Sequence, residues 1–229
     1  MALHIRQRRL RHGGQAAVQT MDLRIAPGEI LALSGPAGCG KTRVLRTLAG
    51  LDPPGHAAVD RDGCRVSWGG ASSPFPMRDL GLVLQGDNLS SDMSVQGHVG
   101  LPLALRGLPQ AQVREGALQA LALLGLQGMG EYRPASLSGG QRQRVLLARS
   151  LVARPRLVLW DAPLSLLGRD LQKALWLELA ALLRHLGCTA VYATQDFEEA
   201  CAIADRVVVM DHGRIPQEFV PAARLEAAD

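Results

Sequence analysis

A glycine-rich loop between an apolar segment and a helical one constrains this chain more than any other feature. The loop follows the pattern G-x-x-x-x-G-K-T and consists of Gly35, Pro36, Ala37, Gly38, Cys39, Gly40, Lys41 and Thr42. Apolar residues 30–33 precede it, and apolar residues at helical spacing follow it. In such a loop backbone N–H groups approach phosphates, the lysine adds a positive charge, and the threonine hydroxyl reaches Mg²⁺. The pattern therefore predicts a nucleotide site at a strand-to-helix turn.

The remainder of the chain alternates between apolar strands and helices. We expect strands at 80–84, 157–160, 189–194 and 206–210, a long helix at 171–186, short strands at 3–5, 18–25 and 64–68, and central helices at 95–105, 109–124 and 138–152. Because the main strands are uniformly apolar, they indicate a parallel sheet covered on both faces.

This pattern predicts one α/β domain over 1–229, with the P-loop NTPase (RecA-like) architecture. The nucleotide-binding core would comprise 1–84, including a short antiparallel β subdomain, and 153–229. A helical subdomain would be inserted at 85–152. A length of 229 residues fits a single domain with one insertion.

Composition narrows the classes of function. Aromatic residues make up only 3% of the chain, which argues against a surface that stacks single-stranded bases. The basic cluster at 6–11 is interpreted as a solvated edge, with an anionic contact as the alternative. No apolar run reaches membrane-spanning length and the start lacks a secretory signal, which indicates a cytoplasmic chain with reduced thiols at Cys39, Cys64, Cys188 and Cys201.

A second motif opens the third central helix. It consists of Leu137, Ser138, Gly139, Gly140 and Gln141, and it precedes an apolar strand that ends in Asp161. Taken alone, Ser138 could be an ordinary helix cap. Together with the phosphate loop, the motif resembles the signature of ATP-binding-cassette (ABC) proteins, and the resemblance covers nearly the whole chain.

The resemblance implies that two such domains sandwich two ATP molecules, each held by the phosphate loop of one subunit and the signature of the other. The loop residues 35–42 would bind phosphates, with Thr42 on Mg²⁺. Asp161 would hold Mg²⁺ through water, and Gln85 would sense Mg²⁺ and link to the helical subdomain. The signature residues 137–141 would serve the partner's ATP.

Five positions depart from the ABC pattern. Ala162 replaces the glutamate that polarises the attacking water, and Gln195 replaces the switch histidine. The others are Gly168 in the dimer-contact loop, Arg43 after the Mg²⁺ threonine, and His12 at the adenine-stacking position. A positioned base contributes roughly 10²–10⁴ in rate. We therefore expect nucleotide binding, with hydrolysis at the chain's own site slow or absent.

Two explanations of these departures stay open: a deliberate ATP trap, or natural divergence to a non-catalytic half. Divergence is favoured, because a trap needs one change rather than five. The chain would then pair with an intact second ABC subunit, although a homodimer is possible. Asp196 and Glu198 lie near Gln195 in sequence, and neither is assigned a catalytic role.

Segments 162–165 and 205–215 are similar to subunits of bacterial solute importers. The resemblance thus implies solute transport through separate transmembrane permease subunits, on the inner face of the membrane, with a solute-binding protein as a further partner. Segment 88–106 would form the groove for a permease helix. A non-transport ABC ATPase and an ATP-gated regulator remain the alternatives, and nucleic acid is not expected as a partner. Cys39 is either a thiol that ATP shields or a packing residue.

Overall fold

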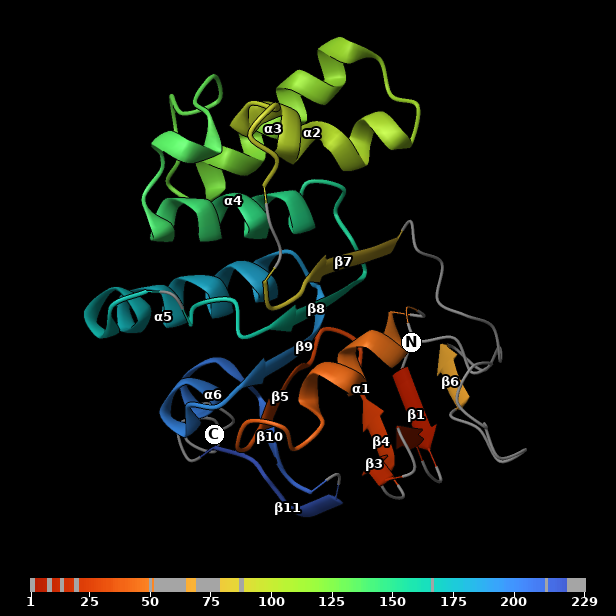
Figure 1. Ribbon diagram of the computed structural model, residues 1–229. Helices are drawn as coiled ribbons and strands as arrows, with labels where there is room; N and C mark the ends of the chain where they lie inside the picture. The colour runs from red at the N-terminus through yellow and green to blue at the C-terminus, as the bar shows by residue number, and fades with distance from the viewer. Residues whose placement is uncertain are drawn as a thin grey trace.

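A six-stranded sheet forms the centre of the molecule (Figure 1). The computed structural model describes residues 3–7, 10–12, 15–18, 21–49, 51, 65–68, 79–86, 89–165, 167–212 and 214–221, with side chains from residue 23 on except at 65–68 and 216. The strand order is β11-β10-β5-β9-β8-β7. The strands are β5 (Ile30–Ser34), β7 (Leu80–Val83), β8 (Leu157–Asp161), β9 (Thr189–Thr194), β10 (Arg206–Asp211) and β11 (Arg214–Phe219). All neighbouring pairs are parallel except β10 with β11. The predicted parallel sheet is confirmed.

Alternate residues of these strands enter two cores on opposite faces of the sheet. In β5, Ile30 and Ala32 pack into the core shared with the helices α4 (Gly139–Leu151), α5 (Arg169–His185) and α6 (Phe197–Ile203). Leu31 and Leu33 pack on the other face, against α1 (Lys41–Leu48). Burial of both faces explains why these strands are apolar throughout.

Two small antiparallel sheets are formed by the N-terminal part. One has the order β4-β1-β6, from β4 (Met21–Ile25), β1 (Leu3–Gln7) and β6 (Arg65–Trp68), and the other pairs β2 (Leu10–His12) with β3 (Gln15–Val18). Leu23 and Ile25 of β4 join the core that contains α1. The predicted strand over 18–25 is thus two strands, β3 and β4. His12 ends β2, and its side chain lies outside the described part of the chain.

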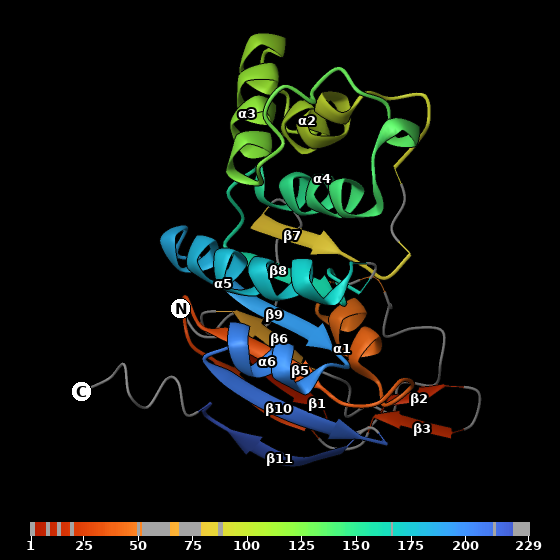
Figure 2. The same cartoon turned by 90° about the vertical axis from the view of Figure 1, so that its left-hand side faces the viewer.

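The central helices lie on one side of the molecule, with α2 (Val95–Leu105) and α3 (Gln110–Leu123) farthest from the sheet and α4 between them and β7 (Figures 1 and 2). The short 3₁₀ helix η2 (Pro134–Ser136) leads toward α4. The Trp160 indole N–H of β8 donates a hydrogen bond of 3.0 Å to the Ser150 hydroxyl of α4. This bond ties the signature helix to the strand that ends in Asp161.

Two elements of the sheet region are not predicted by sequence periodicity. Helix α6 has seven residues and begins at an Asp196 cap, so it is too short to show a helical pattern. Strand β11 contains Pro216, and it lies at a sheet edge, where proline is tolerated. Among the described residues, no helix is long and apolar enough to cross a membrane.

Candidate nucleotide site

The carboxyl ends of four parallel strands lie at the same end of the sheet (Figure 2). Several of the predicted site residues follow or end these strands. Strand β5 leads into the phosphate loop, β7 leads to Gln85, β8 ends in Asp161, and β9 leads to Gln195. The register pairs Asp161 with Ala193. Open α/β sheets bind ligands at this edge, so its position alone suits a nucleotide.

Glycines shape the phosphate loop at two points. Gly35 has φ +146°, and a Cβ there would lie 2.2 Å from the Met210 carbonyl oxygen, so any larger residue would clash with β10. Gly40, at φ +110°, is the N-cap of α1. This backbone conformation favours glycine. The loop therefore turns sharply onto the positive end of the α1 dipole.

Lys41 is buried at the centre of the loop, with 8% of its surface exposed. Its ammonium donates hydrogen bonds to the carbonyls of Gly35 at 2.6 Å and Pro36 at 2.9 Å, and it lies 3.6 Å from the Cys39 sulfur. The charge is therefore held against the loop. The Cys39 thiol is buried in the same contact, which supports its interpretation as a packing residue.

Asp161 gathers three other groups of the site. The Thr42 hydroxyl and the Gln85 backbone form hydrogen bonds with its carboxylate, and the Lys41 charge acts on it. Its Oδ2 atom is buried and has no hydrogen-bond partner among the described residues. Carboxylate and hydroxyl oxygens are the ligands that Mg²⁺ prefers. The Asp161 carboxylate and the Thr42 hydroxyl therefore fit a Mg²⁺ ion that takes its other ligands from phosphate and water, and Gln85 contacts Asp161 through its backbone.

Burial raises the pKa of Asp161 above its usual value, while Thr42, Lys41 and Gln85 partly oppose that rise. The stability associated with this carboxyl is thus present at low pH and lost as the pH rises through its folded pKa.

Without Mg²⁺, Asp161→Asn should therefore unfold at a higher temperature than the unmodified chain at pH 8, and at nearly the same temperature at pH 4. Stabilisation of the unmodified chain by Mg·ATP should weaken toward acid pH, because protons compete for the carboxylate. Thermal unfolding tests both, and equal midpoints of the two chains at pH 8 would contradict the argument.

Ala162 follows Asp161 directly, with φ +46°, an unusual conformation for a residue other than glycine. Its N–H donates to the Ala193 carbonyl at 2.8 Å, and its own carbonyl accepts a hydrogen bond of 2.9 Å from the Ser165 hydroxyl. The position is thus held beside the end of β9. Its methyl group can neither accept a proton nor orient water.

Gln195 is exposed at the turn between β9 and α6. The two neighbouring carboxylates, Asp196 and Glu198, both have partners in the structure. Asp196 caps α6 through the Glu198 and Glu199 N–H groups and lies 3.7 Å from Arg169. Glu198 forms an ion pair of 2.7 Å with Lys173. Both carboxylates are therefore engaged in holding α5 and α6 together.

A buried network of hydrogen bonds lies next to the turn between β9 and α6. The carboxylate of Glu199 accepts hydrogen bonds from the Tyr192 and Thr194 hydroxyls, the latter at 2.5 Å, and Thr194 in turn accepts from the Asp196 N–H at 3.0 Å. Burial raises the pKa of Glu199. Sequence reasoning missed this residue, although the spacing Asp196-x-x-Glu199 is that of a capping box and would have indicated a helix start.

The signature residues form the beginning of α4. The Ser138 hydroxyl accepts from the Gln141 N–H at 3.2 Å, and the Gln141 side chain accepts from the Ser138 N–H at 2.9 Å, so the two close a capping box. Leu137 is buried, and a Cβ on Gly140 would lie 2.9 Å from the Leu167 side chain. This turn lies on the same side of the molecule as the phosphate loop (Figure 2).

Two further positions that differ from the ABC pattern lie at the start of α5 and in α1. Gly168 is the N-cap of α5 and supplies no side-chain cap. Arg43 is partly buried in α1, next to Thr42.

Comparison with known proteins decides the family. The ABC transporter family matches residues 18–165, and this segment holds both the phosphate loop and the signature. The chain belongs to the ABC transporter family. Among solved structures, the ABC cassette MJ0796 in a dimeric post-hydrolysis state with ADP and phosphate superposes with a TM-score of 0.80 at 25% identity, over 95% of this chain and 98% of that one.

Curated ABC relatives include the Fe(3+) ions import ATP-binding protein FbpC of Agrobacterium fabrum, which is 41% identical over 94% of this chain and 60% of its own length. The spermidine/putrescine import ATP-binding protein PotA of Methylococcus capsulatus is 42% identical over 90% of this chain and 52% of its own length. The chain therefore spans between half and two thirds of these relatives.

Proposed function

We propose that this chain is the ATP-binding subunit of an ABC importer, which binds Mg·ATP and dimerises to drive solute transport through separate permease subunits. The observation that carries the proposal is the cluster of Lys41, Thr42, Gln85 and Asp161 at the carboxyl edge of the sheet. Relatives named as import ATP-binding proteins for Fe(3+) ions, spermidine/putrescine and sn-glycerol-3-phosphate support a solute importer. In this proposal the chain works at the inner face of the membrane, with a solute-binding protein as a further partner.

In this proposal the loop 35–42 holds the phosphates, with His12 and Arg43 completing the nucleotide site. Thr42, Gln85 and Asp161 would hold Mg²⁺, which neutralises phosphate charge when bound. The signature 137–141 presents N–H groups and the Ser138 hydroxyl to an ATP bound by the partner. The helical subdomain 85–152 then links this contact to the permease.

We further propose that hydrolysis at the chain's own site is impaired through Ala162 and Gln195. The engagement of Asp196 and Glu198 in a cap and in ion pairs supports this, because no carboxylate on that turn replaces the missing base. Natural divergence accounts for the departures, and a heterodimer with an intact ABC subunit would give this signature a productive role. A homodimer with two slow sites is the alternative.

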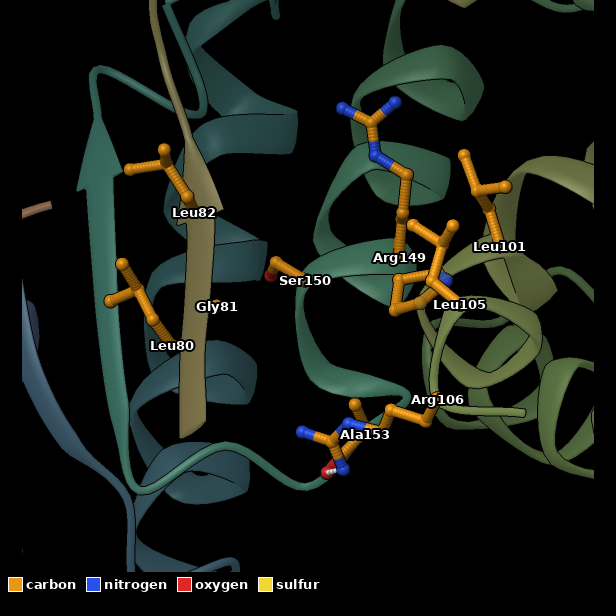
Figure 3. A pocket seen from close by; sticks show the side chains of 10 residues that line it. Leu80, Gly81, Leu82, Leu101, Leu105, Arg106, Arg149, Ser150 and Ala153 are labelled. Atoms are coloured by element: carbon orange, nitrogen blue, oxygen red, sulfur yellow. Dashed lines mark hydrogen bonds between the residues drawn. The ribbon is translucent and has the colours of Figure 1, made fainter. Parts of the chain in front are cut away.

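A pocket of about 420 Å³ between α2, α4 and β7 is proposed as the docking place of the permease (Figure 3). Leu101 and Leu105 supply apolar surface, and Leu105 is 80% exposed. Strand β7 lines the pocket at Leu80, Gly81 and Leu82, but the two leucine side chains point away from α2 and α4, toward the core that contains α1. Arg106 and Arg149 lie on the same lining. Apolar surface combined with cationic groups fits an amphipathic permease helix that carries an acidic residue.

Replacing Leu105 by glutamate should therefore remove membrane subunits from the complex. In native cells we expect at least a tenfold drop in co-purifying permease, because a charge would be buried against the docked helix. Leu123→Glu, at a 57% exposed leucine of α3 outside the pocket, is the matched control and should leave the yield unchanged. If the unmodified chain dimerises with ATP but retains no membrane protein, the second candidate, an ATP-gated regulator suggested by Ala162, replaces the importer.

A further inference from the structure

Arg142 directly follows the signature, and its side chain folds back over the segment that leads into it. One terminal nitrogen, Nη1, donates a hydrogen bond of 2.7 Å to the Leu137 carbonyl and a longer one of 3.5 Å to the Pro134 carbonyl. Pro134 begins η2, and Leu137 immediately precedes the Ser138 cap. The guanidinium thus bridges the entry segment and the helix that follows it.

Other hydrogen bonds also fix the turn at Ser138, where α4 begins. The Arg142 N–H donates to the Ser138 carbonyl at 3.0 Å, while the capping box joins Ser138 to Gln141. Because the Ser138 hydroxyl accepts the Gln141 N–H, its own proton remains available to an anion. The first turn of α4 contains no acidic residue, so the arginine charge adds to the positive helix terminus.

We propose that Arg142 is a positioning residue of the signature. By holding the carbonyls of Leu137 and Pro134, it fixes the turn in which Ser138 and the following N–H groups face a partner-bound phosphate. This inference rests on the proposed function. Arginine suits the task because the two N–H bonds of Nη1 lie in the fixed plane of the guanidinium, whereas a lysine ammonium keeps the charge without that fixed geometry.

Amide hydrogen exchange in the full chain without nucleotide tests the positioning. Arg142→Gln should raise exchange at 137–141 about tenfold, because a charge-assisted hydrogen bond is lost. Arg144→Gln is the matched control: Arg144 lies on the same helix and donates to the Leu124 carbonyl at 3.2 Å, away from the signature. Arg142→Lys should fall between Arg142→Gln and the unmodified chain. Equal exchange in Arg142→Gln and the unmodified chain, or an equal rise in Arg144→Gln, would overturn the inference.

Dimerisation at saturating Mg·ATP supplies the functional readout. Arg142→Gln should raise the protein concentration for half-dimerisation about tenfold, with the ATP affinity of the monomer unchanged, and Arg142→Lys should recover part of the loss. A purely structural role would lower monomer ATP affinity and dimerisation together, and that result contradicts the proposal. If the unmodified chain binds no ATP, the proposed function fails, while the exchange comparison still decides the role of Arg142.

Discussion

Phosphate release should rise on the order of 10²–10⁴-fold when Ala162→Glu is combined with Gln195→His. The glutamate would supply the missing acceptor next to Asp161, and the histidine would restore an imidazole on the adjoining turn. The backbone at position 162 is already fixed by bonds to Ala193 and Ser165, so the new side chain starts from an ordered position. Steady-state release at saturating Mg·ATP measures the change.

The two single variants, Ala162→Glu and Gln195→His, show how much each change contributes to the rise in phosphate release. Ala162→Glu alone should supply most of it, and the two changes need not be additive, because they act on one reacting centre. Ala162→Gln is the matched control, since it adds the same bulk without a base. An equal rise in Ala162→Gln, or no rise in the double variant despite intact Mg·ATP binding, would count against impaired hydrolysis as the consequence of Ala162.

Lys41→Ala should weaken ATP binding on the order of 10- to 100-fold, the value of charge-assisted hydrogen bonds in a buried setting. The Lys41 ammonium is the positive charge held inside the phosphate loop, where burial reduces its screening by solvent. Equilibrium binding of a fluorescent ATP analogue measures the loss. Lys173→Ala, which removes an exposed lysine of α5 paired with Glu198, is the control and should bind normally. Equal affinities for Lys41→Ala and the unmodified chain would place the nucleotide elsewhere.

The sequence predicts those parts of the fold that depend on residues close together in the chain. The strand and helix around 35–42 follow from a contiguous motif and from uniform apolarity, and the ends of β9 and α2 match the expected ranges. The resemblance to ABC proteins predicts Asp161 and Gln85 as site residues, and each lies at or just after the end of an apolar strand. The contacts of Asp161 with Thr42 and with the Gln85 backbone depend on the order β5-β9-β8-β7, which no local pattern specifies.

Polar contacts across turns of the chain account for the two residues that the sequence analysis did not single out. Glu199 is a carboxylic acid that the sequence analysis did not single out, and hydrogen bonds from the Tyr192 and Thr194 hydroxyls satisfy its buried oxygens. Arg142 stands in a polar run of the signature helix, and only the folded entry segment brings the Leu137 and Pro134 carbonyls to it. Both roles arise from pairings between separate elements or turns, so composition and periodicity carry little trace of them.

The ratio of phosphate released to ATP bound in the purified, unmodified chain tests the central claim most directly. Binding and steady-state release are measured in the same sample at saturating Mg·ATP. The account predicts stoichiometric binding of ATP with little or no turnover, because the loop 35–42 is intact while Ala162 and Gln195 supply no base. Turnover on the order of 1 s⁻¹ or more, an ordinary enzymatic rate, would contradict it and would show that another group bypasses Ala162.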